Sequence, residues 1–79
     1  MSLADTPISD SAADAVRLKF NPSDLTDVSV LKHCTASLIS MMEVIRDRND
    51  KFAAREAAIA ITNLQTTSMW CVLAATKGL

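Results

Sequence analysis

Apolar positions from residue 25 onward fall into two long segments separated by a charged turn. From residue 25 to residue 45, apolar side chains recur at intervals of three and four, as on one face of an α-helix. From Ala57 to Thr76 no residue is charged, glycine or proline. Between them Arg46 to Lys51 are all charged or amide residues, the composition of a solvated turn. The pattern predicts an all-α fold built on an antiparallel two-helix hairpin.

Capping residues set the expected helix ends. Ser23 is a favourable N-cap and Asp24 would lie in the first turn, so the first helix is predicted to begin near residue 24. Asn49 or Asp50 is predicted to cap the second helix. That helix is expected to end at Gly78, because a glycine readily takes the left-handed conformation that ends many helices.

The N-terminal part of the chain shows no helical period. Residues 1–15 are small, polar and acidic, and are predicted to form a flexible tail. Val16 to Phe20 alternates apolar with basic residues and is predicted to be a short extended arm. The expected organisation is therefore a tail over 1–15 and an arm plus helical hairpin over 16–79.

The second helix is apolar on most sides, and such a helix is normally buried on most sides. A chain of 79 residues offers only one other long helix, and domains this short often depend on oligomerisation. A membrane span is the alternative, but the polar block from Thr62 to Ser68 interrupts the apolar run that a span needs. We therefore expect a homo-oligomer and no membrane, with Trp70 and the four methionines in the core.

Other side chains are placed by the periodicity of the first helix. Four polar residues lie away from its apolar stripe and are expected to be exposed: Ser29, Lys32, Ser40 and Glu43. Cys34 and Cys71 are at apolar-periodic positions, where a thiol usually acts as a small buried hydrophobe. With no signal peptide expected, we predict free thiols in a reducing cytoplasm, with a disulfide as the less favoured alternative.

Charge and motif content exclude several function classes. The net charge is −1, and the eight basic residues are scattered, which argues against binding of long nucleic acid but leaves open a small ligand with a few phosphates. His33 is the single histidine and has no second ligand at metal spacing, and no glycine-rich phosphate loop is present. We expect a non-enzymatic protein without metal or cofactor.

Three side chains are candidates for binding a flat, anionic ligand. Phe20 either packs the arm against the hairpin or stacks on a base. Lys32 is either a solvated lysine or a phosphate contact. Arg55 either forms a surface ion pair with Glu56 or holds a phosphate near the helix N-terminus. Thr62 most simply bonds to the carbonyl one turn back or across a helix interface.

The chain resembles a family of bacteriophage proteins, the anti-CBASS cyclic-oligonucleotide sponges and their anti-Thoeris relatives, which share a short helical-hairpin domain. The resemblance covers about residues 17 to 77. It rests on the stretch KFNPS, on a lysine in the first helix, and on the second-helix motif R-x-x-A-I-x-x-T-x-L-Q-x-x-x-M-W: Lys19 to Ser23, Lys32, Arg55, Ala58, Ile59, Thr62, Leu64, Gln65, Met69 and Trp70.

The resemblance implies a compact homohexamer in the host bacterial cytoplasm that binds immune second messengers without cleaving them. Cyclic dinucleotides such as cyclic GMP–AMP would lie between neighbouring hairpins, and cyclic trinucleotides in separate sites. By the resemblance, Phe20 stacks on a purine, Lys32 reaches the ligand and Arg55 belongs to the trinucleotide site. Asn21 and Thr62 lie within the family motifs and complete the candidate ligand-binding residues.

A different class of function is also compatible with these features. A helical hairpin that oligomerises, or that connects other phage proteins, needs Phe20, Lys32 and Arg55 only for packing and solubility. An enzyme that hydrolyses the messenger is the third hypothesis. Binding of a cyclic nucleotide, with the nucleotide recovered unchanged, distinguishes the sponge from both.

Overall fold

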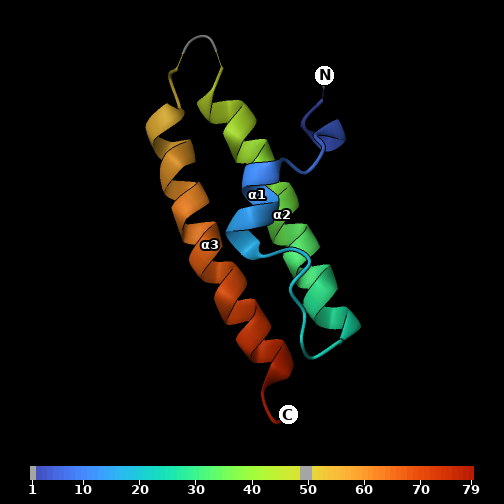
Figure 1. Cartoon of the computed structure of the whole chain (residues 1–79). Coiled ribbons are helices and arrows are strands. Elements are labelled where there is room, and N and C mark those ends of the chain that lie inside the picture. Colours follow the sequence, from blue (N-terminus) through green and yellow to red (C-terminus); the bar gives the residue numbers. More distant parts are fainter. Residues whose placement is uncertain (1, 49–50) are drawn as a thin grey trace.

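The computed structural model describes residues 2–48 and 51–79, which form one short 3-10 helix and three α-helices (Figure 1). Helices α2 and α3 run antiparallel and side by side, and α1 lies against both of them. No strand occurs in these two described ranges, so the predicted all-α hairpin is confirmed. The elements in chain order are η1 (Leu3–Asp5), α1 (Asp10–Val16), α2 (Thr26–Arg46) and α3 (Ala54–Thr76).

Helix α2 begins two residues later than predicted. The residue before it is Leu25, whose side chain makes no capping bond. Ser23 instead accepts a hydrogen bond from the Leu25 amide and donates one to Asn21 Oδ1, while Asp24 has a positive φ of 57°. The predicted N-cap at Ser23 and first-turn position of Asp24 are therefore wrong, because both residues belong to a tight turn that precedes the helix.

The C-terminal end of α3 agrees with the prediction. Gly78 follows the helix with φ of 95°, the conformation that glycine adopts without strain. The N-terminal end lies after Ala53, which makes no side-chain cap. The predicted capping residues Asn49 and Asp50 lie outside the described residues.

Helix α1 occupies the region predicted to be a flexible tail, so that prediction is wrong for its residues. Ser9 caps the helix by accepting a hydrogen bond from the Ala12 amide at 3.1 Å, and Arg17 ends it in a left-handed conformation. The extended arm expected from Val16 is also wrong, because Val16 is the last residue of α1. Seven residues are too few for a stable isolated helix, so α1 owes its stability to packing on the hairpin.

The buried core lies where α1 meets the hairpin. Ala12 and Val16 of α1 pack against Ala36 and Ile39 of α2, and all four are buried. Partly buried apolar residues surround this cluster: Ile8, Ala15, Leu18, Ile61 and Leu64. Small alanines on both helices permit close approach of the two backbones, so α1 packs on a face of α2 outside its contact with α3.

That coverage changes the environment of three polar residues. Lys32 and Ser40 were expected to be exposed, but both are buried, and Glu43 is half-buried. The expectation was wrong because the apolar positions of α2 were assigned to the contact with α3 alone, whereas Ala36 and Ile39 pack against α1.

Helix α3, by contrast, is poorly covered within the chain. Only Ala57 and Ser68 are buried in it, and Met69 and Trp70 are 72% and 66% exposed. The prediction that these two residues lie in a core is therefore wrong for a single chain. Cys34, expected to be buried, is exposed; Cys71 is half-buried, and both thiols are free.

Both long helices have the dimensions and composition of a membrane-crossing segment. Over the described residues, α2 and α3 each contain an apolar window long enough to cross a bilayer. The main helices of a small helical protein satisfy the same criterion, so length and composition do not decide the environment. The absence of a membrane partner stays a prediction.

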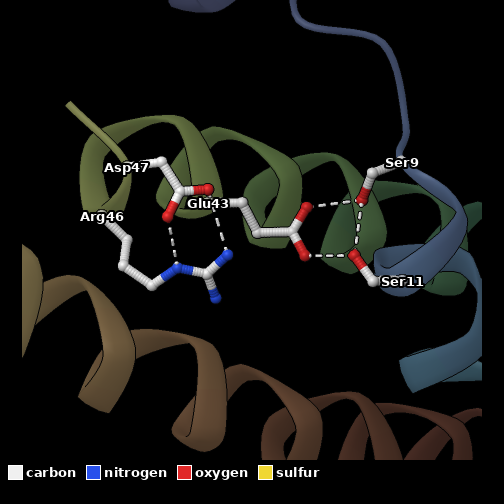
Figure 2. A network of polar contacts seen from close by, with 5 residues as sticks. All are labelled: Ser9, Ser11, Glu43, Arg46 and Asp47. Carbon is white, nitrogen blue, oxygen red and sulfur yellow. Dashed lines mark hydrogen bonds and ion pairs between the residues drawn. The ribbon is translucent and has the colours of Figure 1, made fainter. Parts of the chain in front are cut away.

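A polar cluster attaches the beginning of α1 to α2 (Figure 2). The hydroxyls of Ser9 and Ser11 each donate to one carboxylate oxygen of Glu43, both at 2.5 Å. The Ser9 amide also donates to Ser40 Oγ at 3.0 Å. Arg46 and Asp47 in the same view pair with each other and not with the serines. Glu43 therefore fixes the first turn of α1 at two adjacent points.

We predict that Glu43→Ala loosens α1 selectively. Loss of two hydrogen bonds to a partly exposed carboxylate should lower the stability of the α1 attachment by about 1–2 kcal/mol. Hydrogen exchange followed by mass spectrometry should show faster exchange in residues 12–18 and little change in α3. Asp47→Ala is the matched control, since its carboxylate bonds to Arg46. Equal exchange in the two variants would contradict the attachment role of Glu43.

Candidate functional site

A surface pocket of about 470 Å³ lies between the end of α1 and the middle of α3. Its volume is within the range of small-molecule sites, roughly 300–1,000 Å³. Two other pockets of similar volume contain acidic but no basic side chains. The pocket at α1 is thus the one of the three with cations in its lining: Asp14, Ala15, Val16, Arg17, Lys32, Gln65, Ser68, Met69 and Val72.

Lys32 lies beneath the turn that follows α1. Its ammonium group donates hydrogen bonds to the backbone carbonyl oxygens of Arg17, at 3.0 Å, and of Phe20. The side chain is buried, with 6% of the residue's surface exposed. Lys32 therefore connects α2 to the turn after α1 by donating hydrogen bonds to two carbonyl groups that lie beyond the end of α1.

Burial also affects the pKa of this lysine. The pKa of Lys32 is lowered below its ordinary value of 10.5, first by burial and second by the nearby charge of Arg17. The ion pairs among the described residues are Arg46–Asp47 and Arg55–Glu56, so neither Arg17 nor Lys32 has a carboxylate partner there. The site contains two neighbouring cations whose repulsion an anion would relieve.

Phe20 is positioned beside both cations. The Arg17 Cζ atom lies 5.3 Å from the centroid of the ring, and the Lys32 Nζ atom lies 5.5 Å from it. Both distances are within the range of a cation–π interaction. The residue is still 57% exposed, so the ring keeps surface on which a flat ligand can stack.

Arg17 is a site residue that the sequence reasoning missed. Its φ of 53° is left-handed, a conformation that costs a non-glycine residue about 1–2 kcal/mol. Its amide donates to the carbonyls of Ala13 and Asp14 and so ends α1. A glycine or asparagine is the usual sign of such an end, and with arginine at the position the sequence contains no local signal for it.

Asn21, a predicted ligand residue, is committed to the turn before α2. Its amide nitrogen donates to the Leu25 carbonyl at 2.8 Å and to Ser29 Oγ at 3.0 Å. Its carbonyl oxygen accepts from Ser23 Oγ at 2.7 Å. With both ends of the amide engaged, Asn21 shapes the turn next to Phe20.

Arg55 and Thr62 are not brought to this site within one chain. Arg55 lies at the start of α3, 80% exposed at its side chain and 3.6 Å from Glu56, as a surface pair. The Lys32 position is roughly 20 Å along α2 from the hairpin turn beside which Arg55 lies, at 1.5 Å per residue. Thr62 Oγ1 bonds to the Ala58 carbonyl at 3.2 Å, which is the local role expected for it.

The structure thus brings together two of the five predicted site residues, Phe20 and Lys32, and adds Arg17 and Gln65 around the pocket. Over the described part of the chain, no group of three or more histidine, cysteine, aspartate or glutamate side chains is placed to hold a metal ion. The chemistry available is stacking, positive charge and a small apolar wall, which suits an anionic aromatic ligand.

Comparison with known proteins gives one match. The family model described as "Acb2/Tad1, hairpin domain" matches residues 11–76, a range that includes all but the first residue of α1 and all of the hairpin. No curated protein and no solved structure matches the chain.

The two causes of the lowered lysine pKa can be separated by substitution. We predict that Arg17→Gln raises the pKa of Lys32, because it removes the repulsion and leaves the larger effect of burial in place. The Lys32 pKa should therefore move toward 10.5 without reaching it. A 13Cε chemical-shift titration of the lysines by NMR measures the change. Arg48→Gln, at the hairpin turn, is the control for loss of one charge; an unchanged Lys32 pKa in Arg17→Gln would contradict the proximity of the two cations.

Proposed function

Because the chain belongs to the Acb2/Tad1 hairpin-domain family of phage anti-defence sponges, we propose that it sequesters cyclic oligonucleotide second messengers of bacterial CBASS immunity without cleaving them. Cyclic dinucleotides such as cyclic GMP–AMP are the proposed ligands. The observation that supports this most directly is the exposed Phe20 ring next to two cations that have no carboxylate partner among the described residues. A cyclic dinucleotide presents purine faces to stack and phosphates to pair, in one compact molecule.

The energetics indicate what else binding requires. Stacking on Phe20 contributes ~1–3 kcal/mol per base, and a charge-assisted hydrogen bond adds roughly 1.5–3 kcal/mol. A sponge that holds its messenger at a dissociation constant near 1 nM needs about −12 kcal/mol per site. The contacts available from one chain fall short of that value, so the proposed pocket is closed by a second chain.

A homo-oligomer also accounts for the uncovered surface of α3. Met69, Trp70 and Leu73 are exposed along this helix, and Ile59 adds a fourth apolar side chain nearer its start. Exposed apolar surface of this kind marks an interaction site in a soluble protein. We propose that copies of the chain cover it in a compact hexamer, and that Arg55 and Thr62 contribute to a separate site for cyclic trinucleotides between chains.

The proposed place of action is the cytoplasm of the bacterial host, where these messengers are made and read. Sequestration there is a mass-action effect: it succeeds when sites outnumber the messenger and the dissociation constant is below the signalling concentration. No chemical step is needed. The nucleotide should therefore be recovered intact from the denatured complex.

We predict that Phe20→Ala weakens binding of cyclic GMP–AMP roughly 10- to 100-fold, the equivalent of the lost stacking energy. Isothermal titration measures the affinity, and light scattering on the same sample measures the mass of the oligomer. Phe52→Ala is the matched control, since it removes the same side chain from the hairpin turn. The oligomer mass should be unchanged in both variants.

The same titration distinguishes the sponge from a protein-interaction module. Tight binding by the unaltered oligomer, with intact nucleotide recovered afterwards, supports sequestration. If a well-folded oligomer gives no heat with cyclic di- or trinucleotides, the sponge proposal is overturned and the exposed α3 face becomes the functional surface. If a monomeric variant binds as tightly as the oligomer, the second chain has no part in the pocket.

A further inference from the structure

The two cations beside Phe20, Arg17 and Lys32, differ in how many of their hydrogen-bond donors are already used within the protein. We propose, resting on the sponge function above, that Arg17 is the cation that contacts the ligand phosphate and that Lys32 is a positioning residue that holds the turn carrying Arg17 and Phe20. The division of roles follows from burial, hydrogen bonding and backbone conformation.

Lys32 lines the pocket as Arg17 does, but most of its hydrogen-bonding capacity is used within the protein. It is buried, and two of its three N–H donors already bind the carbonyls of Arg17 and Phe20. One donor is left for a ligand, so a phosphate that takes two hydrogen bonds from this ammonium group would have to displace one of those carbonyls. The turn would then lose one of the two bonds that join it to α2.

Arg17 faces the pocket. It is exposed, lines the pocket wall, and forms no ion pair with a carboxylate among the described residues. Its planar guanidinium has five donors and matches a phosphate with two parallel hydrogen bonds. Asp14 is the one acidic side chain in the lining of the same pocket.

The backbone supports the same assignment. Arg17 occupies a left-handed position where glycine would be unstrained, so the backbone conformation of the turn does not require an arginine. The Phe20 ring, 5.3 Å from the Arg17 Cζ atom, limits where the guanidinium can lie. The bond from Lys32 to the Phe20 carbonyl in turn fixes the backbone that carries the ring.

The test compares Arg17→Gln and Lys32→Met by titration with cyclic GMP–AMP at several salt concentrations, with hydrogen exchange on the same samples. Arg17→Gln should weaken binding about 10-fold or more and make it less dependent on salt, because one exposed ion contact is lost. Exchange in residues 13–20 should be unchanged. Lys32→Met should also weaken binding, keep the salt dependence and speed exchange in residues 17–20.

Two further variants separate ligand contact from general effects. Arg17→Gly should weaken binding as Arg17→Gln does, yet leave the melting temperature unchanged or raised, because it relieves the left-handed backbone. Arg48→Gln removes an exposed arginine at the hairpin turn and should leave affinity and salt dependence as they are.

Three results would overturn the assignment. Unaltered affinity in Arg17→Gln, with binding by the parent protein, would exclude Arg17 as the contact and leave the sponge function standing. Loss of salt dependence in Lys32→Met, with normal exchange in residues 17–20, would make the lysine the ligand contact. Absence of binding by the parent protein would overturn this assignment together with the proposed function.

Discussion

The structure depends on the two hydrogen bonds by which the buried Lys32 ammonium group holds the turn after α1. Through them α2 fixes the backbone of Arg17 and Phe20, and with it the last turn of a helix too short to form alone. The pocket, the exposed ring and the second cation all follow from this attachment. In the part of the chain that the structure describes, no carboxylate pairs with this lysine, so its burial is costly and it contributes positive potential at the site.

The hairpin was predictable because it consists of long helices, and long segments with a clear hydrophobic pattern give the strongest signal for secondary structure in a sequence. Twenty uncharged residues and a charged turn sufficed for α3 and for the antiparallel arrangement. Helix α1 was not predictable in the same way. It has seven residues, and its contacts depend on Ala12 and Ala36. Alanine is common both in flexible tails and in cores, so it does not distinguish the two.

The candidate site was predictable only in part for the same reason. The exposed aromatic Phe20 and the nearby Lys32 were identified as binding candidates, and the structure places them together. The burial of Lys32 and the participation of Arg17 depend on α1, so they could not be predicted from a sequence in which α1 was not recognised. Asn21 shows the reverse case: it lies within a family motif, but its side-chain hydrogen bonds join the turn to the start of α2.

Helix α1 is attached to the hairpin at both of its ends, by the serines on Glu43 at its start and by Lys32 at its finish. A segment held at two points has lost most of its conformational entropy before any ligand arrives. The ordering of a backbone residue costs about 1–2 kcal/mol. If ligand binding had to order this segment, the binding free energy would be reduced by that amount for each residue ordered. A protein that must capture a scarce signal ahead of its receptor gains from such preorganisation in speed as well as in affinity, since no slow folding step separates encounter from capture.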